Sequence, residues 1–312
     1  MKGILILAAL LTSGWSSLIP ENLNPLSDEY IEAINNLGTT WKAGRNFPKD
    51  TSKEYIRNLC GLIKDNGNHL PTRYHDTEGV EIPESYDVRE AWSQCKSVHV
   101  IRDQGDCGAC WAHAGVEAMS DRICIASKGK IQVEVSAQDV ISCDKNAGGC
   151  QGGHVEAAWE YWRDTGIVSG GLYQGEGCKP YGYPPCSHMV PGPYPPCGGM
   201  AKTPECEIEC VPGYNKSYTE DKTYGKNVYS LPPDEEQLQI EIMKHGPIEV
   251  GIAIYEDMLH YKSGVYQHHS GIRWSTHAIK MLGWGVENGV KYWLLANSWN
   301  PYWGDNGKST HT

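Results

Sequence analysis

The sequence lacks an excess of basic residues, and this absence is the first feature that narrows its function. Its 312 residues include 27 Lys and Arg but 38 Asp and Glu, which gives a formal net charge of -11. Proteins that bind nucleic acid need a basic face that displaces counterions from phosphates, so we expect no nucleic-acid partner. The chain also contains no internal repeat.

Long apolar runs are also scarce, and the one candidate is Ile4 to Leu11 near the N-terminus. Lys2 precedes this run and the small residues Gly14 and Ser16 follow it, which predicts a signal peptide over residues 1–16. The run is too short to span a bilayer. We therefore expect a soluble product of the secretory pathway, without a membrane partner, in the lysosome or outside the cell, the gut lumen included.

Cysteine, in contrast, is plentiful, with 12 residues. In an exported chain this number indicates disulfides, because oxidising compartments let thiols pair. Eleven of the cysteines lie between Cys95 and Cys210, whereas Cys60 stands apart. An odd number cannot pair completely, so at least one thiol of this group is left over, as a reactive or an unpaired group. A glycosylation sequon at Asn215 fits a surface loop of an exported protein.

The first part of the chain reads as two short helices and a linker. Apolar residues at helical spacing over 26–37, with Ser27 as N-cap, predict one helix, and residues 54–63 predict another. Residues 66–83 are rich in Pro, Gly and charge, which is typical of a linker. A domain boundary near Glu81 therefore separates this part from a longer one that can form one or two compact subdomains.

The longer part begins with helical patterns and ends with strands. Buried-stripe spacing predicts helices over 110–127 and 155–162, and the Pro, Gly and Cys content of 170–213 predicts an irregular, disulfide-held segment. The final third is rich in β-branched and aromatic residues. Strands are predicted there over 247–254, 278–284 and 290–296.

The last two predicted strands flank Asn288 and Gly289, a turn signal typical of a two-residue hairpin. His277 stands at the entrance of one strand and Asn297 at the exit of the other. The hairpin should therefore bring these two side chains to the same open end.

The strongest functional signal is the run from Gln104 to Trp111, which places Cys110 where a loop enters an apolar-striped helix. Free backbone amides and the helix dipole at that end favour an anion, so the thiol there loses its proton more readily and becomes a nucleophile. An imidazolium partner would lower the pKa of the thiol further. Cys107 to Trp111 also match the pattern C-G-[SA]-C-[WY] of papain-type cysteine proteases in full.

The chain resembles the cathepsin B group of the papain family. The likeness begins at Trp41 to Phe47, ends at Gly307, and includes close matches that are collected here: 136–138, 168–173, 261–267 and 282–289. The resemblance implies an α+β, papain-like fold in which a helical half and a β-barrel-like half enclose a cleft. It also implies an inhibitory propeptide over 17–81, a peptidase domain over 82–312, and neither cofactor nor metal.

The resemblance assigns roles to single residues. It makes Cys110 the nucleophile, His277 the general base and acid, Asn297 the side chain that orients the imidazole, and Gln104 a donor to the oxyanion. Two further roles concern the walls of the site. Trp299 would shield the bond between His277 and Asn297 from water, and the pair Gly152 and Gly153 would bind the substrate backbone.

The resemblance also implies partners and disulfides. Peptides and proteins are the expected substrates, the chain's own propeptide and cystatin-type inhibitors the expected ligands, and a monomer the expected state. Cys110 is then the odd thiol. The implied pairs are Cys95 with Cys124, Cys107 with Cys150, Cys143 with Cys206, Cys178 with Cys210, and Cys186 with Cys197.

Residues 186–197 resemble the occluding loop that lets cathepsin B remove dipeptides from C-termini, but they depart from its pattern. The family has two adjacent histidines there, whereas this chain has His188 followed by Met189. The family's Arg–Asp clasp falls on Tyr194 and Tyr302. We therefore expect mainly endopeptidase activity with weak dipeptidyl carboxypeptidase activity, and His188 as the one remaining loop residue that could bind the substrate carboxylate.

Two more departures concern the body of the domain. His113 occupies a position at which the family has an aromatic residue, and Ser275 and Thr276 replace small residues before His277. After Gly307 the chain stops roughly 25 residues before the family pattern does, which would leave an open strand edge.

Two other functions remain open at this point. A chain with an incomplete sheet could hold the cleft but not the triad, and would then bind peptides or inhibitors without hydrolysing them. Cys107 and Cys110 also form a C-x-x-C pair, which is found in redox proteins and zinc sites. Against that reading, the remaining cysteines are scattered as in a disulfide scaffold.

Overall fold

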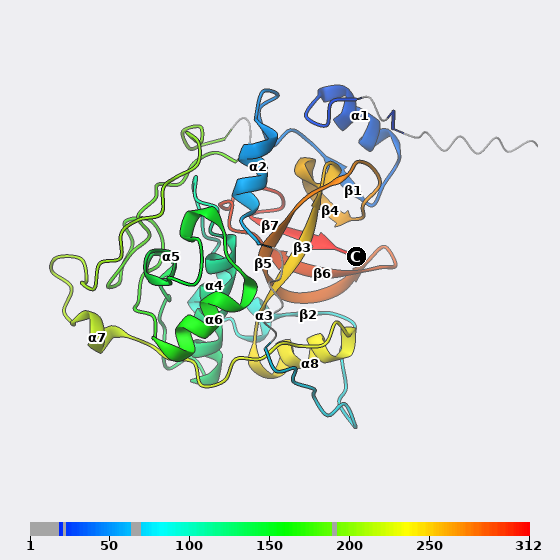
Figure 1. The fold of residues 1–312 in the computed structure, drawn as a ribbon. Helices are drawn as coiled ribbons and strands as arrows, with labels where there is room; N and C mark the ends of the chain where they lie inside the picture. Colours follow the sequence, from blue (N-terminus) through cyan, green and yellow to red (C-terminus); the bar gives the residue numbers. More distant parts are fainter. Residues whose placement is uncertain (1–18, 21–22, 64–69, 189–191) are drawn as a thin grey trace, which may run out of the picture.

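The computed structural model describes residues 19–20, 23–63, 70–188 and 192–312, so the predicted signal peptide lies outside the described residues. Figure 1 shows α4 (Cys110–Ala126), α5 (Ala137–Cys143) and α6 (Val155–Asp164) on one side of the molecule and most of the strands on the other, with α2 (Lys53–Cys60) near the top between them. The helices α1 (Asp28–Asn36) and α8 (Glu235–His245) lie above and below the strands in this view. In the described ranges, no helix has the length and apolar character needed to cross a membrane.

The described part of the predicted propeptide forms two helices and a strand, namely α1 (Asp28–Asn36), β1 (Trp41–Ala43) and α2 (Lys53–Cys60). Ser27 caps α1 as predicted, because its hydroxyl accepts a hydrogen bond from the Tyr30 amide. The second prediction was too long at its C-terminal end. The helix stops at Cys60 because Gly61 adopts a left-handed conformation with a φ of 52°, which ends the helix and turns the chain.

The helical half surrounds α4 (Cys110–Ala126), which matches the predicted helix 110–127. The helix α6 (Val155–Asp164) also confirms its prediction, and both pack on a core that includes Trp111, Val116 and Met119. The smaller elements complete this half: α3 (Val88–Ala91), η1 (Lys96–His99), α5 (Ala137–Cys143), η2 (Gly149–Gln151) and α7 (Tyr218–Asp221).

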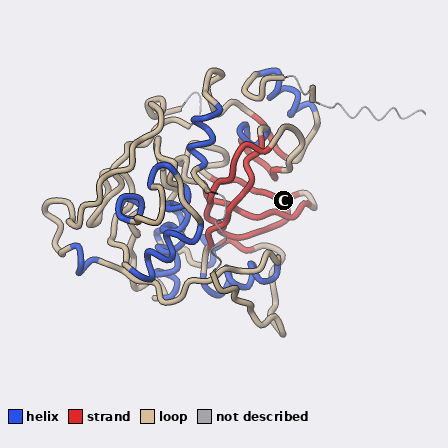
Figure 2. Tube along the Cα trace, in the orientation of Figure 1, coloured by secondary structure: helices blue, strands red, loops and turns tan. Residues whose placement is uncertain are grey.

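Residues 170–213 are irregular, as their composition predicted. They contain no helix or strand in the ranges 170–188 and 192–213 and appear as tan loops around the helices in Figure 2. Five disulfides hold the region from Cys95 to Cys210. These are Cys95–Cys124, Cys107–Cys150, Cys143–Cys206, Cys178–Cys210 and Cys186–Cys197, the same pairs that the resemblance implies.

The other half is a sheet of seven strands in the order β1-β4-β7-β6-β5-β2, with β3 also paired to β5. The bounds are β2 (Tyr86–Asp87), β3 (Ile248–Tyr255), β4 (Tyr261–Tyr266), β5 (Arg273–Glu287), β6 (Val290–Ala296) and β7 (Lys308–His311). The helix α8 (Glu235–His245) covers this sheet through Ile242, and η3 (Asp257–His260) connects β3 to β4.

The predicted hairpin is present. Asn288 and Gly289 both adopt positive φ, 51° and 81°, which allows the tight turn between β5 and β6. The strand β5 begins five residues before its predicted start of 278, because Arg273 to His277 pair with β3. The length of β5 places His277 inside the ladder.

The C-terminal strand β7 corrects the expectation of an open edge at the tail. It pairs with β6 in antiparallel fashion and with β4 in parallel fashion, so both of its sides are occupied. The backbone of the tail also supports the site, because the Asn297 amide donates to the Gly307 carbonyl at 2.9 Å.

The N-terminal segment packs on the sheet half as an integral part of its core. β1 extends the sheet by pairing with β4, and Trp41 packs against Tyr261 and Tyr266 with ring centroids 6.3 and 5.2 Å away. Phe47, Ile56 and other propeptide residues belong to the same buried cluster as residues of the sheet. This attachment fixes the position of α2 above the junction of the two halves.

Candidate active site

Cys110 is the first residue of α4, and its side chain is fully buried. No side chain caps this helix, so its first amides remain available to a negative charge. The preceding turn is fixed by the Cys107–Cys150 disulfide and by the Gly108 amide, which donates to the Cys150 carbonyl at 3.0 Å. The local sequence therefore holds the thiol rigidly at the edge of the helical half.

His277 reaches the same place from the sheet half. It lies within β5, opposite Ile252 of β3, and its Nε2 is 2.8 Å from Oδ1 of Asn297, which directly follows β6. Trp299 covers this pair, since its ring centroid lies 4.8 Å from that of His277 and its side chain is buried. The structure thus brings together Cys110, His277 and Asn297, which are far apart in the sequence.

A propeptide carbonyl occupies the space between the thiol and the imidazole. The Cys110 thiol donates to the Cys60 carbonyl oxygen at 2.5 Å, and His277 Nδ1 lies 3.3 Å from the same oxygen. Cys110 and His277 form no hydrogen bond to each other, although both are in the described part of the chain. The end of α2 therefore separates the two groups.

Burial under the propeptide keeps both groups neutral. It raises the pKa of the Cys110 thiol well above its usual value, although the Ala278 amide donates to Sγ at 3.4 Å and opposes the shift. Burial also lowers the pKa of His277 to about 4, against the opposing effect of Asn297. The thiolate expected at the helix tip is thus not favoured in this form, because no water reaches the site.

Gln104 is also occupied by the propeptide. Its Nε2 donates to the carbonyl oxygens of Leu59 and Cys107, both at 2.8 Å, while Ser298 donates to its Oε1 at 2.7 Å. Ser298 was not identified from the sequence, but it orients the Gln104 amide so that the NH2 group faces the cleft. The donor that the resemblance assigns to an oxyanion here binds a carbonyl oxygen of α2.

Residues 61–63 continue along the cleft and pair with the predicted substrate-binding glycines. The Gly153 amide donates to Gly61 O at 3.0 Å, and the Ile63 amide donates to Gly153 O at 2.9 Å. A Cβ atom at Gly152 would lie 2.6 Å from the Gly61 carbonyl oxygen, so this close approach requires glycine. On the other wall, Gly61 forms a backbone bridge with His277.

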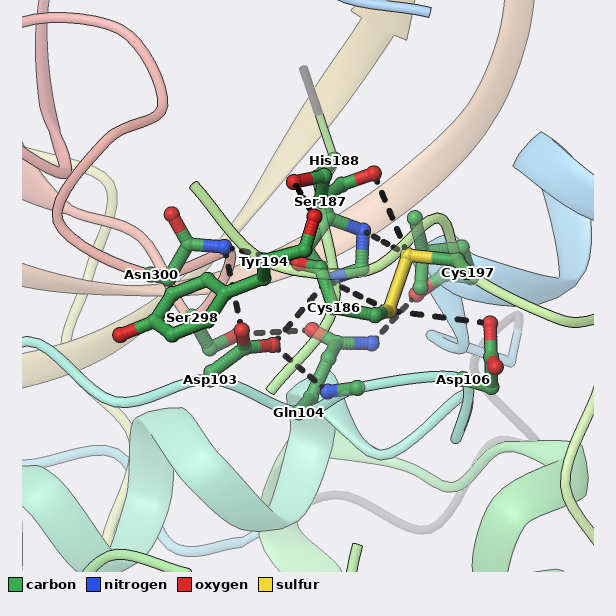
Figure 3. A network of polar contacts seen from close by, with 12 residues as sticks. Asp103, Gln104, Asp106, Cys186, Ser187, His188, Tyr194, Cys197, Ser298 and Asn300 are labelled. Atoms are coloured by element: carbon green, nitrogen blue, oxygen red, sulfur yellow. Dashed lines mark hydrogen bonds and ion pairs between the residues drawn. A yellow bond between two sulfur atoms is a disulfide. The ribbon is translucent and has the colours of Figure 1, made fainter. Parts of the chain in front are cut away.

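The loop 186–197 is held by Asp103, as Figure 3 shows. One carboxylate oxygen of Asp103 lies 3.1 Å from His188 Nε2, and Asn300 donates to the other at 3.0 Å. Asn300 also donates to the Cys186 carbonyl at 2.9 Å. Tyr194 contacts Tyr302 edge to face, with ring centroids 5.6 Å apart, where the resemblance places an ion pair.

His188 is buried in this form, 1% exposed, and its ring stacks near Trp299 at a centroid distance of 6.1 Å. The sulfur atoms of Cys186 and Cys197 lie beside it, but they are bonded to each other in a disulfide and offer no thiolate to a metal. Asn215, the predicted glycosylation site, lies exposed in the loop before α7.

The residues that block the site were missed by the sequence reasoning. Leu59, Cys60 and Gly61 contribute backbone carbonyls, which carry no signature of side-chain type. The available signal was indirect: Gly61, a residue type that often ends a helix, stands inside the second predicted helix, 54–63, and marks where α2 in fact ends. The side chain of Cys60 is itself a free, buried thiol.

Comparisons with known proteins agree with this geometry. Residues 82–310 match the family model described as papain family cysteine protease, and residues 26–66 match the peptidase family C1 propeptide. A cathepsin B-like cysteine proteinase of Schistosoma japonicum is 46% identical over 92% of this chain and 86% of the relative. Cathepsin B-like cysteine proteinase 4 of Caenorhabditis elegans is 43% identical over 97% of this chain and 92% of the relative.

A solved structure of a related precursor also resembles this chain. Procathepsin B S9 from Trypanosoma congolense superposes with a TM-score of 0.79 at 32% identity, over 93% of each chain. The match includes the N-terminal segment that occupies the cleft.

Proposed function

We propose that this chain, which belongs to the papain family of cysteine proteases and is a cysteine-type peptidase, cleaves peptide bonds through Cys110, His277 and Asn297 once its propeptide has left. The observation that carries this proposal is the single Cys60 carbonyl oxygen that both Cys110 and His277 contact. A peptide carbonyl placed between a thiol and an imidazole marks where a scissile bond would lie.

Removal of α2 from the cleft changes the chemistry of the pair. Water and substrate then reach Cys110, so the burial that raises the pKa of its thiol is relieved. The helix dipole and a protonated His277 both favour the thiolate in that state. His277 takes up the thiol proton, and the Asn297 amide oxygen holds the imidazole through its 2.8 Å contact with Nε2.

The reaction then follows the acyl-enzyme route. The Cys110 sulfur attacks the substrate carbonyl carbon, and the resulting oxyanion receives hydrogen bonds from the Gln104 amide and the Cys110 backbone N–H. His277 gives its proton to the leaving amine as the C–N bond breaks. A water molecule, deprotonated by His277, attacks the thioester, releases the carboxylic acid and restores the thiol.

Two further features support substrate binding along the cleft. Gly153 forms backbone hydrogen bonds to residues 61 and 63 in the precursor, and an extended substrate can use the same amide and carbonyl. Trp299 excludes water from the bond between His277 and Asn297. The sheet around Asn297 is complete enough to hold it, because β7 is paired on both sides, and this favours a peptidase over a protein that binds without turnover.

The direct test uses protein from which the propeptide has been removed at acidic pH. An epoxide inhibitor that alkylates activated thiols should label Cys110 alone and stop peptide hydrolysis, since Cys60 leaves with the propeptide. The matched control is Cys110→Ala, which should neither be labelled nor hydrolyse peptides. A folded, processed protein that hydrolyses no peptide, or that is labelled elsewhere, contradicts the proposal.

We also propose that the enzyme is mainly an endopeptidase. Loop 186–197 provides one histidine, His188, in place of two, and its clasp is the aromatic contact between Tyr194 and Tyr302. An edge-to-face pair contributes about 0.5–1.5 kcal/mol. Dipeptide release from a substrate with a free C-terminus should therefore be slow, and faster in Met189→His. Equal rates of dipeptide release by the parent and by Met189→His, at a level similar to endopeptidase turnover, would refute the proposal that the enzyme is mainly an endopeptidase.

The cellular location of the protein is also a proposal. We propose that the protein matures in the secretory pathway and acts in a lysosome or outside the cell, as five disulfides are typical of oxidising compartments. Exposed Asn215 is the proposed glycan site. Cystatin-type inhibitors, which we propose as ligands of the cleft, would compete with peptide substrates. A secreted protein without glycan at Asn215 would refute that assignment.

A further inference from the structure

A second stretch of the propeptide, residues 70–76, is bound to the peptidase domain outside the cleft. The Arg73 amide donates to the Ser230 carbonyl at 2.9 Å, and the Ser230 amide donates to the Pro71 carbonyl at 3.1 Å. Thr72 and Ser230 form a parallel β-bridge. The stretch therefore binds through its backbone, in the way that an extended peptide adds to a strand edge. These bonds use none of the residues assigned to catalysis.

The side chain of Gln237 on α8 continues the pairing. Its Oε1 accepts a hydrogen bond from the His75 amide at 2.6 Å, and its Nε2 donates to the His75 carbonyl at 3.0 Å. One side chain thus binds both backbone groups of one residue, as a partner residue does in a hydrogen-bonded strand pair. In Figure 1, α8 lies below the sheet and α2 above it, so this contact is distant from the helix that blocks the cleft.

Glu241, also on α8, supplies a buried negative charge next to His75. Its side chain has no exposed surface, and its Oε2 lies 2.6 Å from His75 Nε2. Burial raises the pKa of this carboxyl, but the Arg122 charge and the Tyr229 hydroxyl outweigh burial and hold the pKa below its usual value, so the group is ionised. A carboxylate can only accept, so the His75 ring donates.

The two oxygens of Glu241 have different partners. Arg122 and the Tyr229 hydroxyl both bind Oε1, each at 2.8 Å, and they belong to the peptidase domain. In the part of the chain that the structure describes, His75 is the only partner of Oε2. When residue 75 leaves, this oxygen can accept a charge-assisted hydrogen bond from a donor on another peptide.

Arg73 makes a second contact that favours a cation. Its guanidinium lies 4.9 Å from the centroid of the Tyr229 ring, which is a cation–π distance. Arg73 and His75 are two residues apart, so in an extended segment their side chains lie on the same face. The surface therefore recognises a spacing, with one positive side chain over the Tyr229 ring and one nitrogen donor on Glu241.

The other face of the segment borders unfilled space. Leu70 and Thr72 line a cavity of about 420 Å³, together with apolar residues of the peptidase domain that include Val228, Leu238 and Val250. A side chain larger than threonine can enter this cavity. The surface is therefore not restricted to the sequence of the propeptide itself.

We propose that the peptidase domain has a second peptide site, formed by Tyr229, Ser230, Gln237 and Glu241, which binds an extended segment of another protein with Arg or Lys two residues before a histidine. Residues 71–75 fill this site in the precursor. Residues 71–74 are exposed, so the segment lies on the surface and can leave it. The site goes beyond the proposed peptidase activity, because binding needs only the departure of this segment and no catalytic group.

The test is a fluorescence anisotropy titration with a labelled peptide that has the sequence of residues 70–76. The protein is the full-length precursor with Arg73→Gly and His75→Gly, which removes both side-chain contacts of the tethered segment and leaves α2 in the cleft. The peptide should bind this protein saturably. It should bind the parent precursor at least about tenfold more weakly, because the parent's own segment fills the site.

A control peptide and matched variants identify the surface. A peptide with Arg73→Glu and His75→Glu should bind at least about tenfold more weakly. In the same precursor, Gln237→Ala and Glu241→Gln should each weaken binding of the original peptide by about tenfold, whereas Glu236→Ala, at an exposed position of the same helix, should not. Thermal unfolding controls for folding, and either of the two site variants suffices if the other fails to fold.

The proposal is overturned if the peptide does not bind saturably, if the control peptide binds equally well, or if the site variants bind as tightly as Glu236→Ala. These outcomes are independent of the peptidase proposal, because the titration uses a precursor whose cleft is occupied. Processed protein that hydrolyses no peptide would contradict the proposed catalytic roles and leave the titration result unchanged.

Discussion

The two walls of the cleft are built by different means. The helical wall, which carries Cys110, includes the irregular residues 170–213 and all five disulfides. The sheet wall carries His277 and Asn297, and the sequence that forms it after Cys210 contains no cysteine. This wall is held by strand pairing and by the apolar cluster between α8 and the sheet. Covalent links thus occur where the backbone lacks a regular hydrogen-bond ladder.

The site is assembled from both walls. In the proposed mechanism a nucleophile on a disulfide-held turn must meet a base on a strand ladder, so the proposed catalysis depends on the position of the two halves relative to each other. The propeptide joins both halves, because residue 61 forms a backbone bridge with His277 and residue 62 forms one with Gly153. Latency therefore arises at the junction and from neither wall alone.

Removing one catalytic group from each wall tests whether the walls act as a unit. Cys110→Ala and His277→Ala should each reduce kcat of the processed enzyme by at least about 10³-fold, and the double variant should be hardly worse than either. The measurement is kcat with a fluorogenic peptide. If the loss in the double variant instead equals the product of the two single losses, the two residues act independently. The circular dichroism of the variants controls for folding.

Opening a disulfide should destabilise the helical wall selectively. The paired substitution Cys107→Ser and Cys150→Ser removes a link across 43 residues and should lower the free energy of unfolding by about 2–5 kcal/mol. Cys60→Ser is the matched control, since Cys60 is also buried but has no disulfide. Urea denaturation measures both. An equal loss in the control would mean that the disulfide itself contributes little.

Two histidines of the sheet wall, the buried His277 and the partly buried His311, should make the precursor acid-sensitive by a smaller amount. Burial lowers the pKa of His277 to about 4 and that of His311 to about 3, whereas an unfolded histidine titrates near 6.5. Below that value the unfolded chain binds more protons than the folded one, so stability falls as the pH falls from about 6.5 towards about 4.

Each of these two histidines should account for about 2 kcal/mol between about pH 7 and about pH 4.5. The thermal midpoint of Cys110→Ala precursor, measured across this range, should fall less steeply when His311→Phe is added. If His311→Phe leaves the pH dependence unchanged, the C-terminal strand does not contribute to acid sensitivity.

The sequence predicts the local features of both walls well. The caps and buried residues of α1, the length of α4 and the hairpin at Asn288 and Gly289 follow from signals within one element. The positions of His277 and Asn297 follow from that hairpin. The helix α8 was missed although Asp234 caps it and acidic residues follow the cap, because three of its five buried residues are Gln or Glu and leave no clear apolar stripe.

The features that the sequence did not predict depend on contacts between segments that lie far apart in the chain. The strand β1 has three residues, too few for an alternating pattern, and forms only because β4 accepts it. The tail residues Lys308 to His311 become a strand because β4 and β6 leave a place between them. The Cys60 carbonyl reaches the active site through packing of α2, which no residue type announces.

In the precursor, the Cys60 carbonyl keeps Cys110 and His277 apart, and burial keeps both neutral. The most direct test of this blocking role is the rate of Cys110 alkylation by iodoacetamide, read by peptide mass mapping, in intact and processed protein at about pH 6. Burial raises the pKa of the Cys60 thiol to about 12, so it should compete little. We expect rapid modification of Cys110 after processing and strong protection before it, whereas equal rates in the two forms would contradict the blocking role of the Cys60 carbonyl.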